Sequence, residues 1–415
     1  MSSYIIQGKT KLEGEVKISG SKNASLPILA ASLLNAGITK LYNVPNIHDT
    51  QKMIEILELL GCKIKKKDNK ITIDSSNIKR HEIPEHLMRE MRSSVVLAGS
   101  LLGRYREAMF SYPGGCDIGA RPIDLHLKAF EKLGINIIEN YGKIECKCDK
   151  IIGTKIDLDF PSVGATENTI LAACLADGVT TISNAAREPE IIDLQNFLNK
   201  MGAKIKGAGT NVIEIVGVKK LKDVNYNVML DRIEAGTFLV AGAVTGGNIR
   251  INNLSSNCIE PIINKLEEAN CKIKIEKNAI ELQAPKRLKA VDIKTMPYPG
   301  FPTDMQSVFG TAMTVAKGTS VIVENIFENR YKYTQELIRM GAKITIEGRT
   351  AIIKGIKRLQ GTTVKATDLR GGAALVVAGL AAQGVTEVEE IHYILRGYEK
   401  FEQKLSKLGA KIYIK

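Results

Sequence analysis

Basic side chains recur at corresponding places along this 415-residue chain. Polar or charged groups open the stretches that we expect to form Ala-rich buried helices: Lys22 with Asn23, Arg92, Arg232, Asp304, and Asp368 with Arg370. Arginines also stand in the segments that enter the following helices: Arg121, Arg187, Arg330 and Arg396. Helix N-termini attract anions, and Arg and Lys add a planar fork and a compact positive charge. The pattern predicts a site for a small carboxylate or phosphate, and the alternative for any single arginine is an ion pair with a nearby carboxylate.

Residues 112–122 depart from the pattern of the rest of the chain. Their sequence, YPGGCDIGARP, is rich in glycine and proline, which predicts an exposed, irregular loop. Cys116 lies in this loop, five residues before Arg121. Because a nearby positive charge favours the thiolate, this setting is typical of a reactive cysteine.

The other candidate groups favour structural roles. Cys174 lies within the apolar string LAACLA, where core packing is expected. Cys146 and Cys148 form a CxC pair without a second ligand pair at zinc spacing, so no metal site is predicted. The histidines form no metal-binding group, and we expect His126 to be structural or close to substrate. The sequence contains neither GxGxxG nor the P-loop motif, which argues against those nucleotide-binding folds.

Composition indicates a globular, cytosolic protein. Hydrophobic residues make up 44% and charged residues 25%, with no signal-peptide pattern and no apolar run long enough to span a bilayer. The 7 cysteines are scattered, as in a reduced protein. A net charge of +13 is spread thinly and aromatics are only 5%, so we expect a solvated basic surface with no nucleic-acid partner and no membrane insertion. The oligomeric state stays open.

A repeat of about 70 residues organises the chain. The junctions LLGCKI, KLGINI, KMGAKI, EANCKI, RMGAKI and KLGAKI each join a helical stretch to an alternating strand. Their pivot residues suit a left-handed helix cap and are Gly61, Gly134, Gly202, Asn270, Gly341 and Gly409. Each unit is expected to run strand, buried helix, strand, amphipathic helix, strand, strand, with the second unit as the least regular.

The two ends of the chain indicate how the units are grouped. The sixth unit stops at Lys415 without its last strand, whereas 4–7 is a surplus strand before the first unit. We therefore predict two α/β domains of three repeats around buried helices: residues 22–229, and residues 1–21 with 230–415. A chain that crosses twice between domains suits a cleft that opens and closes.

Several long motifs carry a family resemblance. The strings SGSKNASLPILAA, PGGCDIGARPIDLH, SVGAT, NAAREPEI, DRIEAGTFLVA, FPTDMQ, IFENR, DLRGGAALV and RGYE resemble the bacterial UDP-N-acetylglucosamine 1-carboxyvinyltransferases. The resemblance runs from about residue 4 to the C-terminus. It implies two inside-out α/β domains and transfer of the enolpyruvyl group of phosphoenolpyruvate to the sugar 3′-hydroxyl, the committed step of peptidoglycan synthesis. It implies no metal and no organic cofactor.

The resemblance also assigns roles to individual residues. Cys116 matches the proton donor that can form an adduct with phosphoenolpyruvate, and Asp304 matches the base that takes the sugar hydroxyl proton. The positions matching the phosphoenolpyruvate site are Lys22, Asn23, Arg121, Arg330, Arg370 and Arg396. The positions matching the UDP-N-acetylglucosamine site are Arg92, Arg121, Pro122, Ile123, Asp124, Leu125, Ser162, Val163, Gly164, Asp304 and Ile326. Phe160 departs from relatives that carry Lys there, so that charged contact is missing.

Two other functions compete with this interpretation. The first is 3-phosphoshikimate carboxyvinyltransferase, which shares the fold and the donor but lacks the loop cysteine motif. The second is a non-catalytic paralogue that binds nucleotide sugar, against which the presence of Cys116, Asp304 and the basic set argues. Phosphate release measured with each acceptor separates the three.

The first prediction tests Cys116 as a general acid. Cys116→Asp should retain turnover and resist alkylation by the epoxide fosfomycin, because a carboxylic acid can deliver a proton but lacks the thiolate. The reference pKa of Asp is about 3.9, so the useful protonated fraction, and with it the activity, should fall as pH rises. Cys116→Ser should have a much lower turnover, since a hydroxyl is too weak an acid for this proton transfer. Phosphate release against pH, with and without fosfomycin, measures both, and an active Ser variant beside an inactive Asp variant would exclude the assignment.

Overall fold

The structure of the protein, a computed structural model, describes residues 2–114, 118–119 and 122–415. Two candidate residues, Cys116 and Arg121, lie outside these ranges. The chain divides into a C-terminal unit (Met1–Ser19, Asp117–Ala120, Leu230–Lys415) and an N-terminal unit (Gly20–Cys116, Arg121–Met229). The predicted boundaries differ from this division at residues 20–21 and 117–120. Ser21 groups with the N-terminal unit because its backbone N–H donates to the Met229 carbonyl at 2.8 Å.

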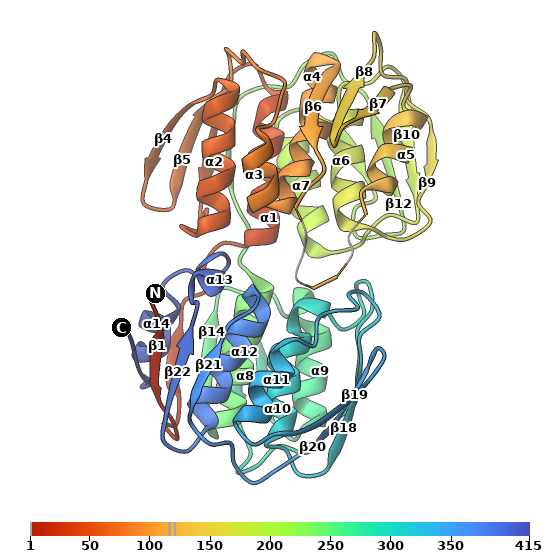
Figure 1. The fold of residues 1–415 in the computed structure, drawn as a ribbon. Coiled ribbons are helices and arrows are strands. Elements are labelled where there is room, and N and C mark those ends of the chain that lie inside the picture. The colour runs from red at the N-terminus through yellow and green to blue at the C-terminus, as the bar shows by residue number, and fades with distance from the viewer. Residues whose placement is uncertain (1, 115–117, 120–121) are drawn as a thin grey trace. The chain divides into compact units, whose positions relative to one another are not determined.

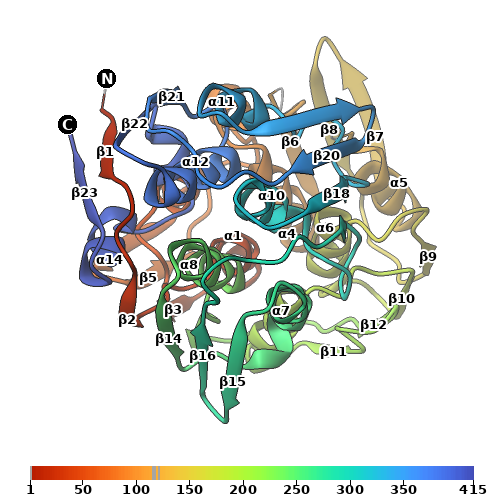
Figure 2. The same cartoon turned by 90° about the horizontal axis from the view of Figure 1, so that it is seen from below.

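Each unit has its own hydrophobic core, built on helices that are apolar nearly all round. These helices are α1 (Lys22–Ala31), α4 (Val96–Tyr105) and α6 (Val163–Ala173) in the N-terminal unit, and α8 (Arg232–Thr245), α10 (Gln306–Thr314) and α12 (Leu369–Ala381) in the C-terminal unit. Within the C-terminal unit α8, α10 and α12 pack against one another, and the sheets lie outside them (Figures 1 and 2). The predicted fold class, an inside-out α/β arrangement in two domains, is confirmed.

The remaining helices are amphipathic or short. They are α2 (His48–Leu60), α3 (Glu85–Glu90), α5 (Asp124–Lys132) and α7 (Pro189–Lys200), then α9 (Glu260–Glu268), α11 (Tyr333–Arg339), α13 (His392–Leu395) and α14 (Phe401–Lys407). No helix in the described ranges has the length and apolar character needed to cross a membrane.

The N-terminal unit carries three sheets among its described residues. The first has the order β13 (Val224–Asn227), β3 (Ile38–Tyr42), β5 (Lys70–Asp74), β4 (Lys63–Lys67). The second has β6 (Glu107–Ser111), β8 (Lys143–Lys147), β7 (Asn136–Asn140), and the third β11 (Lys204–Lys206), β12 (Val212–Val216), β10 (Val179–Ser183), β9 (Lys155–Asp157). In the second repeat the expected leading strand is reduced to one bridge between Glu82 and Met109, and Pro84, which has no N–H, lies two residues after Glu82.

The C-terminal unit repeats the arrangement. Its sheets have the orders β15 (Lys272–Glu276), β16 (Ala279–Gln283), β14 (Asn248–Asn252), β2 (Glu13–Val16); then β17 (Ile293–Lys294), β18 (Thr319–Val323), β20 (Thr350–Lys354), β19 (Lys343–Glu347); and β21 (Thr363–Lys365), β22 (Val385–Glu389), β1 (Tyr4–Gln7), β23 (Lys411–Ile414). Strand β1 lies between β22 and β23 and pairs antiparallel with both. The prediction that the N-terminal strand completes the sixth repeat is therefore confirmed.

The six pivot residues all adopt the left-handed conformation. Their φ angles are 119° at Gly61, 84° at Gly134, 101° at Gly202, 70° at Asn270, 94° at Gly341 and 99° at Gly409. Backbone conformation therefore favours Gly or Asn at the end of each amphipathic helix.

Gly341 isolates this backbone effect, because a Cβ added there would meet nothing within 4 Å. Gly341→Ala should lower the free energy of unfolding by about 1 kcal/mol through strain at positive φ. Gly341→Asn, which reproduces the residue found at position 270, should lower it less. Urea unfolding of the three proteins measures the difference, and equal losses for Ala and Asn would contradict the cap assignment.

Candidate active site

The Asp304 carboxylate joins two buried guanidinium groups in the C-terminal unit. Arg330 donates from Nη2 to Asp304 Oδ1 at 2.8 Å, and Arg370 donates from Nη2 to Asp304 Oδ2 at 3.0 Å. The three residues come from two successive repeats. Asp304 lies in a 3₁₀ turn, Thr303–Met305, before α10, and Arg330 lies in the loop before α11 of the same repeat, whereas Arg370 lies in the first turn of α12. Each carboxylate oxygen is thus committed to one arginine.

Both guanidinium groups are almost fully removed from water. Arg330 and Arg370 are each 3% exposed, whereas the Asp304 side chain is 26% exposed. Burial alone would lower the pKa of Arg370, but the Asp304 carboxylate, with Tyr398 and Asp231, raises this pKa well above its usual value. Arg370 therefore stays charged.

Each arginine also keeps an unused donor. Among the described residues, Arg330 Nε and Arg370 Nη1 are buried atoms without a hydrogen-bond partner. Buried N–H groups of a charged side chain are costly to leave unpaired. Two cations sharing one carboxylate, with donors to spare, make an arrangement suited to a further small anion.

Aromatic rings fix the planes of the two guanidinium groups. Arg370 Cζ lies 5.4 Å from the Tyr398 ring centroid, and Arg330 Cζ lies 5.3 Å from that of Phe327. The Tyr398 hydroxyl is in turn 2.9 Å from Thr237 Oγ1 on α8. The RGYE motif thus contributes a buried tyrosine that the sequence analysis did not single out.

Other predicted residues of this unit occupy different settings. Asp368 caps α12, accepting from the backbone N–H groups of Arg370 and Gly371, so it holds the helix end rather than a ligand. Arg396 follows α13, five residues before α14, and is half-buried. Ile326, also half-buried, lies in the loop after β18. Arg232 opens α8 behind its Asp231 cap.

Lys22 opens α1 in the N-terminal unit and pairs with a buried aspartate. Its Nζ lies 3.1 Å from Asp49 Oδ2, and the Asp49 side chain is only 2% exposed. Asn23 follows Lys22 on the same helix and is half-buried. Arg92 was predicted to open a buried helix, but it begins a 3₁₀ turn, Arg92–Val95, and α4 starts only at Val96.

The residues predicted to bind nucleotide sugar gather at the starts of α5 and α6. Asp124 opens α5 behind the exposed Pro122 and the buried Ile123, and Leu125 is half-buried. Ser162 caps α6, accepting from the Ala165 backbone N–H at 3.3 Å, and Val163 and Gly164 form its first turn. Phe160, just before this cap, is 44% exposed.

His126 is held in one orientation next to Gly164. Asn168 Oδ1 accepts from the Gly99 backbone N–H at 2.8 Å, so its Nδ2 must be the donor to His126 Nδ1, 2.7 Å away. Nδ1 therefore carries no proton and Nε2 carries one. His126 is 7% exposed, in agreement with the structural alternative considered from the sequence.

The structure also reveals buried carboxylates that pattern analysis missed. Glu324 is fully buried beside Thr303. In the N-terminal unit, burial raises the pKa of Glu167 well above its usual value, and Glu190 and Glu188 raise it further. No sequence pattern marks Glu324 or Glu167 as buried, because a Glu near a strand end or helix start ordinarily faces solvent. Cys174, in contrast, is buried as predicted, and burial raises the pKa of its thiol to about 12.

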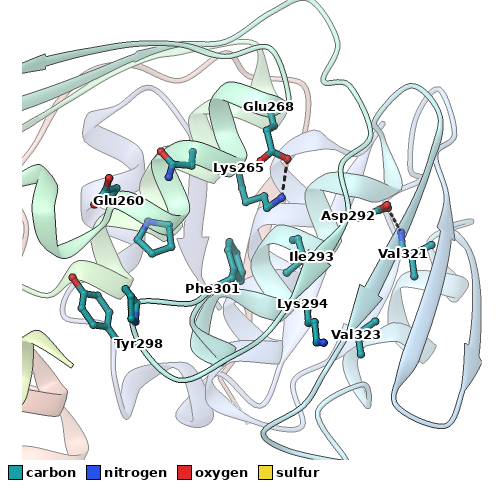
Figure 3. Close-up of a pocket in the computed structure, with 13 residues that line it drawn as sticks. Glu260, Lys265, Glu268, Asp292, Ile293, Lys294, Tyr298, Phe301, Val321 and Val323 are labelled. Carbon is teal, nitrogen blue, oxygen red and sulfur yellow. Dashed lines mark hydrogen bonds and ion pairs between the residues drawn. The ribbon is translucent and has the colours of Figure 1, made fainter. Parts of the chain in front are cut away.

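A cavity of about 760 Å³ in the C-terminal unit is lined by none of the predicted site residues. It lies between α9 and the segment 292–301, with Phe301, Tyr298 and Lys294 among its walls (Figure 3). Lys265 and Glu268 pair across its edge at 2.7 Å. Its walls mix charged and apolar groups and hold no cluster comparable to Asp304 and its arginines.

Solved enolpyruvyl transferases share the fold. The enolpyruvyl transferase NikO from Streptomyces tendae superposes with a TM-score of 0.90 at 24% identity, covering 100% of this chain and 98% of that chain. EPSP synthase from Acinetobacter baumannii superposes with a TM-score of 0.79 at 18% identity, covering 100% and 99%. These similarities establish the class of fold.

Sequence relatives establish the family. Residues 6–405 match the family described as EPSP synthase (3-phosphoshikimate 1-carboxyvinyltransferase). A UDP-N-acetylglucosamine 1-carboxyvinyltransferase 2 from Caldanaerobacter subterraneus subsp. tengcongensis is 53% identical over 413 residues, 99% of both chains. A UDP-N-acetylglucosamine 1-carboxyvinyltransferase from Geobacter metallireducens is 49% identical over 412 residues, again 99% of both. The chain belongs to the EPSP synthase family of enolpyruvyl transferases, and the resemblance seen in its motifs is confirmed.

The contact between Gly164 and His126 can be tested by coupling two substitutions. A Cβ at position 164 would lie 3.0 Å from His126 Cε1, so Gly164→Ala should lower the free energy of unfolding by about 1–2 kcal/mol. In a His126→Ala background, Gly164→Ala should leave the free energy of unfolding unchanged or raise it, since Ala is more favourable than Gly in a helix by about 1 kcal/mol. Denaturant unfolding of the four proteins gives the coupling, and additive losses would show that the contact is unimportant.

Proposed function

We propose that this protein transfers the enolpyruvyl group of phosphoenolpyruvate to the 3′-hydroxyl of UDP-N-acetylglucosamine and releases phosphate, the first committed step of peptidoglycan synthesis. Relatives carrying that activity in their names are 49–54% identical over nearly the whole chain. The same similarity disfavours the shikimate-directed alternative. Both substrates are made in the cytoplasm, so we propose that the protein acts there, with no nucleic-acid or membrane partner.

The observation that carries the proposal is the carboxylate shared by two buried arginines. Asp304 stays within 3.0 Å of both guanidinium groups, which favours its ionised form, the form that accepts a proton. The unpaired buried donors on Arg330 and Arg370 suit the carboxylate of phosphoenolpyruvate. One group of side chains thus offers a base for the acceptor and a clamp for the donor, which a merely sugar-binding paralogue does not need.

The chemistry can be written with these groups. The Cys116 thiol delivers a proton to the methylene carbon, C3, of phosphoenolpyruvate, which leaves positive charge at C2. The sugar oxygen attacks C2 while Asp304 takes the hydroxyl proton. The C2–O bond to phosphate then breaks and phosphate leaves, and C3 returns a proton to the Cys116 thiolate, which restores the double bond. General acid and general base catalysis contribute about 10²- to 10⁴-fold each, and the fixed arginines contribute charge stabilisation.

The remaining predicted residues are proposed to bind the substrates. Lys22, Arg121 and Arg396 would bind the phosphate of phosphoenolpyruvate, with Asn23 beside Lys22. Arg92, Ile326 and the starts of α5 and α6 would bind UDP-N-acetylglucosamine. Nothing in this scheme calls for a metal or an organic cofactor.

The direct test is mass spectrometry of the product formed from phosphoenolpyruvate and UDP-N-acetylglucosamine. Formation of UDP-N-acetylglucosamine enolpyruvate with stoichiometric phosphate would support the proposal. Phosphate release with shikimate 3-phosphate alone would favour the shikimate enzyme, and binding of nucleotide sugar without any phosphate release would favour the non-catalytic paralogue.

Asp304→Asn should separate binding from turnover. The amide keeps the shape of the side chain but cannot take a proton, so kcat should fall by about 10²- to 10⁴-fold. Removing the negative charge leaves both arginines positive, so phosphoenolpyruvate should bind at least as tightly as to the wild type. Calorimetric titration in the presence of UDP-N-acetylglucosamine, beside phosphate release, measures the two effects. Retained turnover in the variant would refute the base assignment.

A further inference from the structure

Glu324 is a fully buried carboxylate that joins several segments of the C-terminal unit. Its Oε1 accepts from Thr295 Oγ1 and the Ile326 backbone N–H, both at 2.8 Å, and from the Phe327 backbone N–H at 3.1 Å. Its Oε2 accepts from Thr303 Oγ1 at 3.0 Å. Within the described residues Glu324 makes no ion pair, and four hydrogen bonds satisfy its two buried oxygens.

Thr303 links the Glu324 carboxylate to Arg330. Its hydroxyl donates to Glu324 and therefore presents a lone pair to Arg330, whose Nη1 donates to Thr303 Oγ1 at 2.8 Å. Arg330 Nη2 is the group bound to Asp304. A continuous chain of hydrogen bonds thus runs from Glu324 through Thr303 and Arg330 to the Asp304 carboxylate.

The Glu324 carboxylate also holds together the two ends of the loop that leads into Asp304. Thr295 and Thr303 stand at the two ends of this loop, and each binds one oxygen of Glu324. Its outer part includes Tyr298 and Phe301, which line the 760 Å³ cavity (Figure 3), and Phe301 also packs against Phe309 in the core. Glu324 therefore ties together the two ends of this loop, one of which leads into Asp304.

We propose that Glu324 is a positioning residue for the reaction: acting through Thr303, it fixes the Arg330 guanidinium and the Asp304 carboxylate in the geometry that takes the acceptor proton. This inference rests on the proposed function. Glu324 itself touches no substrate; its role is to prevent Arg330 from turning away from Asp304. Misplacement of a reacting group by about 1 Å can cost about 10²-fold in rate.

Glu324→Gln isolates the link to Thr303. Three donors converge on the position of Oε1, so the amide oxygen must occupy it, and the amide NH₂ must replace Oε2. The NH₂ then faces Thr303 as a donor, and the Thr303 proton loses its acceptor. The contacts that hold Ile326 and Phe327 survive, so the loop after β18 is kept while Thr303 loses the acceptor that orients its hydroxyl toward Arg330.

The kinetic test combines this variant with two changes at Thr303. Glu324→Gln and Thr303→Val should each lower kcat about 10- to 100-fold, with the KM for UDP-N-acetylglucosamine within about twofold of wild type. Thr303→Ser, which keeps the hydroxyl, should restore most of the rate. The double variant Glu324→Gln/Thr303→Val should be no slower than the slower single variant, since both changes break the same chain.

A matched control separates positioning from folding. Glu336 lies on α11 of the same unit and accepts from the Lys365 backbone N–H at 3.0 Å, away from Asp304. Glu336→Gln, the same change of a carboxylate to an amide, should keep both kcat and KM. Wild-type kcat in Glu324→Gln, or multiplicative losses in the double variant, would overturn the inference. An inactive wild type would instead overturn the proposed function, so the two failures are distinguishable.

Discussion

The site depends on one ionic constraint: a single carboxylate, Asp304, is shared between two arginines that are each 3% exposed. Buried guanidinium groups are stable only when charge and hydrogen bonds compensate the loss of water. One carboxylate compensates two cations only in part. The deficit, together with the buried N–H groups of Arg330 and Arg370 that have no partner among the described residues, makes this region suited to a further anion.

The inside-out arrangement explains how such charges reach the interior. In each unit the innermost helices are apolar along their length, while their first turns or the turns just before them carry polar residues. Equivalent positions of successive repeats therefore bring equivalent side chains to the same end of the helices. Asp304 and Arg370 are such a pair, since one precedes α10 and the other opens α12, and these helices pack together.

Further hydrogen bonds hold the two arginines in place. Thr303 and Glu324 hold Arg330, and Thr237 and Tyr398 hold the region around Arg370. Donor and acceptor roles are fixed in the series of hydrogen bonds from Glu324 through Thr303 to Arg330, because a carboxylate can only accept and a guanidinium can only donate. Side chains ordered in this way need no rearrangement when charge develops during a reaction, which is the basis of electrostatic catalysis.

The sequence by itself determined the repeat, the helix caps and the strand that closes the last sheet, because these rest on local conformation and periodicity. Gly61 and Asn270 have left-handed backbones for reasons contained within a few residues of chain. The motifs likewise determined the family, and they singled out Asp304, Arg330 and Arg370. Only the tertiary structure decided that these three bind one another, that Asp368 serves as a cap, and that Arg92 begins a 3₁₀ turn. Glu324 and Glu167 could not be found from the sequence, since the burial of a carboxylate depends on partners far away in the chain, and no local pattern encodes that distance.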